Sequence, residues 1–250
     1  MKIFTRIMLI ASGIMATIGA ICMVIAFCMG LNVGMIGDMI AEGKLSFDIG
    51  DVHGIQIHTP VTTTQEITEP VEELELAYGA GTVYICYEEV ENIIVEAAGV
   101  LNFDASVEDG KLFVEGGLGI VKNGTGALVV KLPKEYAFDK VSIEIGASSA
   151  TIEGLKTKGF DITVGAGKAT IEELDAKEIA VEVGLGQLEL NLVGEETEYS
   201  YNVECGIGSV EIGGNKYAGL GASNQVDRTD AEREIDIECG VGDVTVKFEK

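Results

Sequence analysis

Hydrophobic and polar residues alternate with a period of two over most of the chain after residue 73, in short runs interrupted by glycines. Such alternation is typical of strands with one buried and one exposed face. One pattern recurs: alternating apolar positions, a glycine, an apolar residue, a second glycine or a serine, and then renewed alternation. Its six copies are 74–85, 141–152, 160–171, 179–190, 201–212 and 235–246.

The glycines divide each copy into two strands. Glycine adopts backbone angles that other residues avoid, so a glycine pair between strands predicts a tight corner or a bulge. The residue between the glycines is apolar in every copy, and we expect it to point into the core, because an exposed hairpin turn would prefer Asn, Asp or Gly there. The predicted structural corners are Gly79, Gly81, Gly146, Gly165, Gly167, Gly184, Gly186, Gly206, Gly208, Gly240 and Gly242.

Repeats of this kind are expected to stack so that equivalent residues form ladders. The predicted fold class is therefore all-β, a β-solenoid or β-roll of Gly-x-Gly-cornered strand repeats, preceded by one N-terminal transmembrane helix. The expected core columns are Ile143, Ile162, Val181, Val203 and Ile237, and Ile152, Ile171, Leu190, Ile212 and Val246. Another strand pattern, not a helix, follows every glycine pair, which disfavours a dinucleotide-binding motif.

The first forty residues follow a different pattern. The run Ile7–Gly37 contains no charged residue and exceeds the roughly 20 apolar residues that a membrane-spanning helix needs. A secretory signal has a shorter apolar region, so we interpret the run as an uncleaved anchor. Lys2 and Arg6 precede it, and the positive-inside tendency then predicts a cytoplasmic N-terminus. The predicted localisation is the cell membrane, with a single pass and an extracytoplasmic C-terminal domain.

Three segments follow from these patterns. Residues 1–39 form a cytoplasmic stub and the transmembrane anchor, residues 40–73 a juxtamembrane segment or linker, and residues 74–250 the β-strand-repeat domain. Within the second segment, the stretch 59–70 is polar and flanked by prolines, which is typical of a linker or an exposed loop.

The repeat domain contains less regular parts. Irregular strands are expected over residues 86–140, with a hairpin at Glu108-Asp109-Gly110-Lys111 and a mobile loop over 116–126. A second loop, 213–234, interrupts the repeats before the last copy. Loops on rigid scaffolds often carry binding, although a tolerated surface insertion is the simpler interpretation. The candidate binding residues of this loop are Tyr217, Leu220, Arg228 and Arg233.

Acidic residues number 41 and basic residues 17, a formal net charge of −24. A nucleic-acid-binding protein needs a basic footprint, so nucleic acid is not an expected partner. His53 and His58 have no further histidine or nearby cysteine with which to bind a metal, and we interpret them as surface residues. No catalytic, cofactor-binding or metal-binding residue is predicted.

Two columns of the repeat leave alternatives open. Glu144, Glu182, Glu204 and Glu238 share an outward position, which favours a solvated acidic surface over a divalent-cation site. Cys205 and Cys239 share an inward position. Stacked neighbours at strand spacing could form a disulfide, but small apolar packing is the commoner arrangement.

The chain resembles the putative adhesin family of bacterial membrane-anchored proteins, which have a β-strand-repeat domain of unknown function. The resemblance rests on the order of several motifs. They are the anchor ending Ile-Ala-Phe-Cys-Met-Gly30, the segments 109–115 and 132–141, the successive Gly-x-Gly strands, and the C-terminal segment 237–246. It implies a surface-exposed β-solenoid of a kind often found in Gram-positive bacteria, and it implies no catalytic residues.

The predicted function is a non-catalytic, membrane-anchored surface module, adhesin-like, that binds a protein or glycan along one face or through the loop at 213–234. One alternative is an extracytoplasmic regulatory or sensory component of a cell-envelope stress response. A second is a wall-polysaccharide hydrolase, although no aromatic platform for sugar rings is evident.

Overall fold

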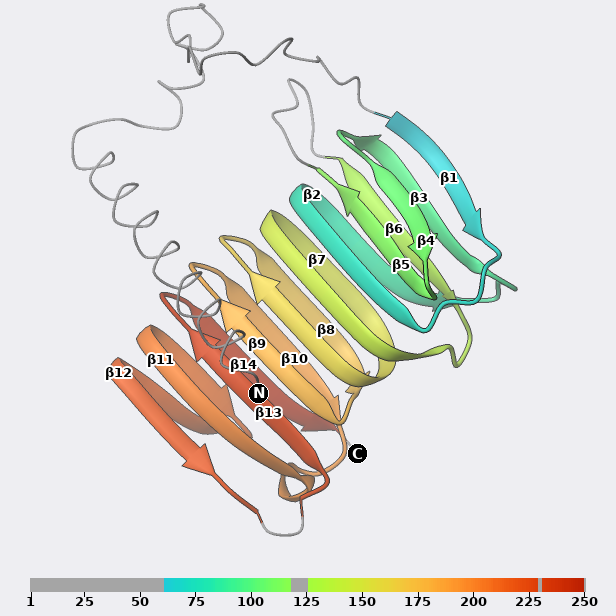
Figure 1. Ribbon diagram of the computed structural model, residues 1–250. Helices are drawn as coiled ribbons and strands as arrows, with labels where there is room; N and C mark the ends of the chain where they lie inside the picture. The colour runs from blue at the N-terminus through green and yellow to red at the C-terminus, as the bar shows by residue number, and fades with distance from the viewer. Residues whose placement is uncertain (1–60, 118–125, 229–230, 250) are drawn as a thin grey trace, which may run out of the picture. The chain divides into compact units, whose positions relative to one another are not determined.

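The computed structural model describes residues 61–117, 126–228 and 231–249 (Figure 1). The predicted anchor and most of the predicted mobile loop at 116–126 lie outside these residues. No helix among the described residues is long and apolar enough to cross a membrane. The one helical element there is a short 3-10 turn, Glu196–Glu198. The strands are β1 (Val61–Ile67), β2 (Glu73–Glu88), β3 (Ile93–Val100), β4 (Asp104–Glu108), β5 (Lys111–Gly116), β6 (Ala127–Pro133), β7 (Ala137–Val164), β8 (Lys168–Asp175), β9 (Glu178–Val183), β10 (Gln187–Val193), β11 (Tyr199–Ile212), β12 (Asn215–Val226), β13 (Arg233–Cys239) and β14 (Asp243–Glu249).

Seven strands close into a ring through parallel pairings, in the order β7, β8, β10, β14, β11, β13, β9 and back to β7. The described chain is all-β, but it forms a closed seven-stranded parallel barrel, and the prediction of a β-solenoid is wrong. The ring closes because β7 and β11 each pair with different strands along their length. β7 pairs with β8 over residues 149–156 and with β9 over residues 159–164, so its change of partner lies at the corner opposite the glycines. β11 pairs with β13 before its glycine corner and with β14 after it.

The copies do not lie side by side in sequence order. The last copy, 235–246, lies between the copies 179–190 and 201–212, because β13 pairs with both β9 and β11 and β14 pairs with both β10 and β11. All copies share one alternation of inward and outward residues, so each can pair with any other without exposing apolar side chains. The repeat pattern therefore specifies strands but not their order.

The interior of the barrel is lined by the two columns expected from the sequence, and this prediction is confirmed. None of the ten column residues is more than 3% exposed. Burying a side chain of this size contributes about 1.5–3 kcal/mol relative to leaving it in water. These columns, which run through every strand of the ring, make the barrel a rigid scaffold for whatever its outer surface carries.

Further strands extend the sheet beyond the ring, with β1 and β12 at opposite ends (Figure 1). β1 lies in the stretch 59–70 that was expected to be a linker or loop; it is largely exposed and pairs antiparallel with β3. β4 and β5 form the expected hairpin, with Asp109 and Gly110 both at positive φ. β12 occupies much of the predicted loop at 213–234 and pairs antiparallel with β11.

Candidate binding surface at the glycine corner

Each copy turns from one barrel wall into the other at its glycines, and hydrogen bonds between backbones join neighbouring corners. The Val241 amide donates to the Gly184 carbonyl at 2.7 Å, and the Ile207 amide donates to the Gly240 carbonyl at 2.7 Å. The corner glycines expected from the sequence all lie along this ladder. The corner is therefore a fixed edge of the barrel whose backbone groups are already paired.

Space explains why glycine is used at the second position of the corner. Gly186 is buried where the two walls converge, and a Cβ there would lie 2.6 Å from the Gly167 carbonyl oxygen and 2.7 Å from Cγ1 of Val164. In the copy 141–152 this position is Ser148, which is also buried and donates from its hydroxyl to the Tyr78 carbonyl at 3.3 Å. The second corner residue thus takes the inward position.

The residue between the glycines points outward, and the prediction that it enters the core is wrong. Leu185 is 47% exposed, Val241 46% and Ile207 58%. The inward position belongs to the next residue, so the alternation of the chain turns the middle side chain toward solvent. The corresponding alanines of the other copies, Ala80, Ala147 and Ala166, are exposed as well.

Leu185, Val241 and Ile207 lie in three adjacent corners and form what we call the aliphatic ridge. Their order follows the barrel, not the sequence, because the last copy lies between the other two. Among the residues whose side chains the structure describes, Val61 is the one other large hydrophobic residue that is comparably exposed. Our sequence reasoning missed the ridge, although one signal was available: these three copies carry Leu, Val or Ile where the others carry Ala.

A row of carboxylates runs beside the ridge, three residues earlier in the same copies. Glu238 is the register partner of Glu182 on β9 and of Glu204 on β11. We call these three exposed residues the glutamate stripe. Neighbouring strands are about 4.8 Å apart, so the carboxylates are close enough to repel one another. Glu144, the fourth member of the predicted column, lies opposite Ala77 and outside the stripe.

The stripe leaves its negative charge uncompensated. The pKa of Glu238 is raised above its ordinary value. Partial burial is the larger cause, and repulsion from Glu182, Glu204 and Asp236 is the smaller one. Within the described part of the chain, no stripe residue forms an ion pair, whereas other acids do, such as Asp161 with Lys140 at 2.6 Å. A cation from a partner would relieve this repulsion.

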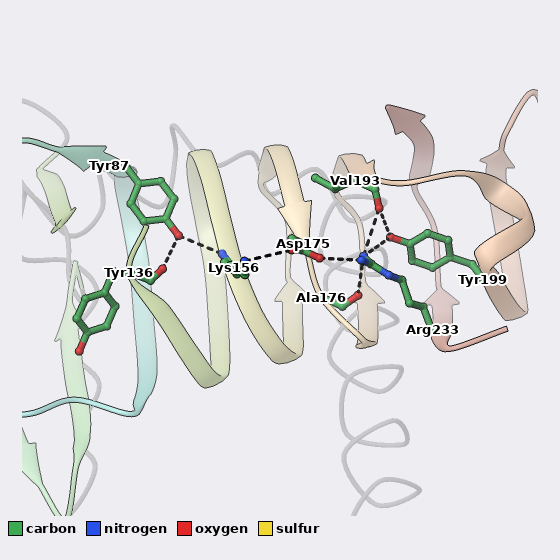
Figure 2. Close-up of polar contacts among 8 residues, drawn as sticks. All are labelled: Tyr87, Tyr136, Lys156, Asp175, Ala176, Val193, Tyr199 and Arg233. Carbon is green, nitrogen blue, oxygen red and sulfur yellow. Dashed lines mark hydrogen bonds and ion pairs between the residues drawn. The ribbon is translucent and has the colours of Figure 1, made fainter. Parts of the chain in front are cut away.

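Arg233, predicted as a binding residue, instead fastens the opposite corner of the barrel (Figure 2). Its Nη1 donates to the Tyr199 hydroxyl at 2.9 Å and to the carbonyl oxygens of Ala176 and Val193 at 3.3 Å each. Its Nη2 lies 2.9 Å from Oδ1 of Asp175. One guanidinium thus joins three separate segments of the chain, at 175–176, Val193 and Tyr199, and it is not free to bind a ligand.

A second tyrosine, Tyr87 on β2, also forms hydrogen bonds at this corner (Figure 2). The Tyr87 hydroxyl donates to the Tyr136 carbonyl at 2.6 Å and accepts from the Lys156 amide at 3.1 Å. The Lys156 ammonium lies 3.9 Å from Asp175, which also pairs with Arg233. Backbone hydrogen bonds join this corner too, such as the Glu234 amide to the Lys177 carbonyl at 2.8 Å, and the side chains of Tyr87, Tyr199 and Arg233 add further links.

Two of the other candidate loop residues, Arg228 and Tyr217, both contact Tyr201. Arg228 donates to the Tyr199 carbonyl and pairs with Glu196 at 3.2 Å, so it too is engaged within the chain. The Tyr217 ring packs against Tyr201, with 3.3 Å between the two hydroxyl oxygens. Leu220 lies on β12, as the register partner of Ile207. The structure thus brings Tyr217, Arg228 and Arg233 together around Tyr199 and Tyr201, where contacts within the chain already engage them.

An open acidic depression of about 420 Å³ lies elsewhere on the barrel, lined by Glu153, Gly154, Glu172, Glu173, Asn191 and Glu249. Its acids come from strands β7, β8 and β14, and no aromatic side chain lines it. Within the described residues, no group of three or more His, Cys, Asp or Glu side chains is arranged to hold a metal ion. The depression therefore lacks the sugar-binding platform that a polysaccharide hydrolase would need.

The cysteine column lies inside the barrel, behind the stripe. Cys205 and Cys239 are register partners on β11 and β13, but both are buried free thiols, so the possible disulfide is not formed in this structure. Burial, together with the neighbouring Cys205, raises the pKa of Cys239 to about 12. Thiolate chemistry needs a lowered pKa, which disfavours it at Cys239, and both thiols pack within the apolar core.

The fold resembles that of solved bacterial proteins. A putative cell adhesion protein from Clostridium sporogenes aligns with a TM-score of 0.52 at 19% identity, over 76% of this chain and 100% of that chain. A putative adhesin from Bacteroides fragilis aligns with a TM-score of 0.33 at 11% identity, over 74% of this chain and 97% of that one. No family model and no curated protein matches the chain. The resemblance to putative adhesins is thus confirmed as a likeness of fold, carried by the Clostridium protein.

Proposed function

We propose that the chain is a surface-binding module without catalytic activity, held at the outer face of the cell membrane by its N-terminal apolar segment. The observation that carries this proposal is the pairing of an exposed aliphatic ridge with an uncompensated glutamate stripe on a rigid barrel. Exposed apolar groups that line up on a scaffold mark interaction surfaces, because leaving them in water has no stabilising role for the monomer. The adhesin-like fold of the Clostridium protein agrees with this role.

The ridge favours a protein ligand over a glycan. Leu185, Val241 and Ile207 offer flat aliphatic contact, and none of them provides the aromatic face on which sugar rings stack. The stripe would also repel anionic wall polymers. A protein partner satisfies both features, since it can supply apolar side chains and positive charge together.

The full chain, reconstituted in phospholipid nanodiscs, should retain ligands from a protein array. Truncating the ridge in the variant Leu185→Ala/Val241→Ala/Ile207→Ala should abolish that binding, because it gives these copies the alanines of the other corners. The matched control is Val61→Ala, which shortens an exposed aliphatic residue outside the ridge. Absence of any retained ligand, or equal binding by the ridge variant, would refute the proposal.

The membrane arrangement has its own test. Epitope tags at the two termini of the full chain are stained on intact protoplasts and after permeabilisation. We expect the C-terminal tag to be stained in both cases and the N-terminal tag only after permeabilisation. Staining of the N-terminal tag on intact cells, or release of the chain into the medium, would contradict the arrangement.

A further inference from the structure

We propose that the aliphatic ridge and the glutamate stripe together bind a cationic amphipathic α-helix of a partner protein. The inference rests on the proposed binding function and names the chemistry of its ligand. Each of three adjacent copies contributes one carboxylate and, three residues later, one exposed aliphatic side chain. The surface therefore consists of two parallel rows, one negative and one apolar.

Spacing favours a helix as the occupant. Both rows repeat at the distance between neighbouring strands, about 4.8 Å. Side chains at i, i+3 and i+7 on one helix face are separated by about 5 Å per step along the axis, at 1.5 Å per residue. In an extended strand, residues on one face repeat about every 6.6–6.8 Å, so after one position they no longer match the 4.8 Å spacing of the ridge residues. A helix lying across the three corners can thus contact every ridge residue.

The two rows also match the two faces of such a helix. Leu or Val side chains in the apolar stripe of the helix would pack on Leu185, Val241 and Ile207, while flanking Lys or Arg side chains would reach Glu182, Glu238 and Glu204. Apolar contact supplies affinity, and the opposed charges supply orientation and a faster encounter. Neither row alone selects this ligand, because a bare cation would leave the ridge exposed and an uncharged helix would leave the carboxylates unpaired.

Charge disfavours a second copy of this chain as the occupant. The protein has a net charge of −24, so two copies repel one another. The surface is also local: in the copies at 74–85, 141–152 and 160–171 the ridge position is alanine, and the stripe position is Ala77, Glu144 or Thr163. Only one end of the barrel therefore offers both rows, which gives a single binding site.

A synthetic helical peptide provides a direct probe. An 18-residue peptide with Leu at the a and d positions and Lys at e and g, labelled with fluorescein, is titrated with the full chain in nanodiscs, and its anisotropy is measured. We expect saturable binding of this peptide. A peptide of the same composition, scrambled so that Leu is spread around the helix, should bind at least tenfold more weakly. Equal binding of the scrambled peptide would overturn the proposal.

Variants separate the site from general electrostatic attraction. The stripe variant Glu182→Gln/Glu204→Gln/Glu238→Gln and the ridge variant should each weaken peptide binding about tenfold. The matched control, Glu69→Gln/Glu91→Gln/Glu108→Gln, removes the same charge from exposed positions away from the site and should change affinity less than twofold. An equal loss in the control would overturn the proposal, because the peptide would then follow net charge alone.

The peptide and array experiments fail independently. A protein ligand that is lost in the ridge variant, combined with no binding of the Leu/Lys peptide, would refute the helix and leave the binding function standing. If the array retains no protein ligand and the Leu/Lys peptide does not bind, both the binding function and the helix proposal are refuted. Millimolar calcium is added as a competitor; if it displaces the peptide while binding tightly to the stripe, the site is a cation site and the helix proposal falls.

Discussion

A single residue type sets the geometry of the glycine corner. At Gly186 a Cβ would meet a carbonyl oxygen and a valine methyl group at distances that no packed structure tolerates. The same lack of space turns the preceding residue outward. The steric need of one residue thus creates the exposed position that, in three copies, holds a large aliphatic side chain.

Replacing Gly186 with alanine should destabilise the barrel by about 1–3 kcal/mol, the usual cost of overpacking. The reason is the contact with Gly167 and Val164. Urea unfolding of the full chain measures the difference. Gly159→Ala is the matched control, because a Cβ there would meet its nearest atoms at 3.8 Å or more. A loss in Gly159→Ala as large as in Gly186→Ala would contradict the steric explanation.

Partial burial of Glu238, together with repulsion from its neighbouring carboxylates, predicts a second stability effect with a defined pH dependence. The pKa of Glu238 is raised in the folded state, so its ionisation opposes folding above that pKa, and the penalty disappears as the pH falls toward the ordinary value of 4.5. Glu238→Gln should therefore stabilise the chain at pH 7, by about 0.2–1 kcal/mol, the range for a cross-strand pair. The gain should vanish near pH 4.

Thermal unfolding of the full chain at pH 7 and pH 4 measures this gain. Glu144→Gln is the control, since Glu144 lies opposite Ala77 and no acid faces it on β2. Equal stabilisation by both variants, or a gain that grows as the pH falls, would argue against repulsion within the stripe.

At the scale of elements, backbone hydrogen bonds join neighbouring segments at both corners of the barrel, and the opposite corner is also fastened by charged and aromatic side chains. The glycine corner is a ladder of backbone hydrogen bonds, and it leaves its side chains free for contact. The opposite corner depends on the side chains of Tyr199 and Arg233, which bind carbonyl oxygens between strands (Figure 2). Substitutions should therefore have opposite consequences at the two corners: loss of binding at the first and loss of stability at the second.

Arg233→Lys should destabilise the chain by about 1.5–3 kcal/mol, because an ammonium cannot reproduce the planar contacts to Ala176, Val193, Tyr199 and Asp175. Peptide binding at the ridge should be unchanged under conditions where the variant is folded. Urea unfolding measures the loss. Lys134→Met, which removes an exposed partner of Glu89, should change stability by less than about 0.5 kcal/mol. If Arg233→Lys leaves the free energy of unfolding unchanged, the corner is held by other contacts.

At the scale of the whole molecule, net charge acts on folding and on binding in opposite directions. Self-repulsion at −24 weakens the folded state, whereas the same field attracts a cationic ligand. The Debye length, over which salt screens charges from one another, falls from about 30 Å at 10 mM salt to about 3 Å at 1 M salt. Raising sodium chloride over this range should stabilise the chain against urea and weaken its binding of the Leu/Lys peptide.

The control variant Glu69→Gln/Glu91→Gln/Glu108→Gln distinguishes the two effects. It should show a smaller salt dependence of stability than the natural chain but nearly the same salt dependence of peptide affinity, because it leaves the stripe intact. Parallel changes in both quantities would mean that no local charge pattern directs binding.

The sequence by itself determined the strands of the repeated copies, their core columns and the positions of the corner glycines, but not β1 and β12 or the outward direction of the middle corner residue. Alternation with a period of two is a local property, and burial of both predicted core columns follows from it directly. The hairpin at Asp109-Gly110 was equally predictable from the sequence, because its turn needs positive φ at two successive residues and Asp-Gly adopts such angles readily. The contacts of the candidate binding residues in the loop at 213–234 were not predictable in this way, because partners such as Ala176, 57 residues from Arg233, are distant in sequence.

Only the tertiary structure decided how the strands join and what faces solvent. Closure into a barrel depends on β7 and β11 pairing with different strands on either side of a corner, and the place of the last copy depends on which neighbours fit best. Identical alternation in every copy makes these choices nearly degenerate in sequence. The aliphatic ridge and the glutamate stripe exist because that packing brings the copies 179–190, 235–246 and 201–212 together in this order.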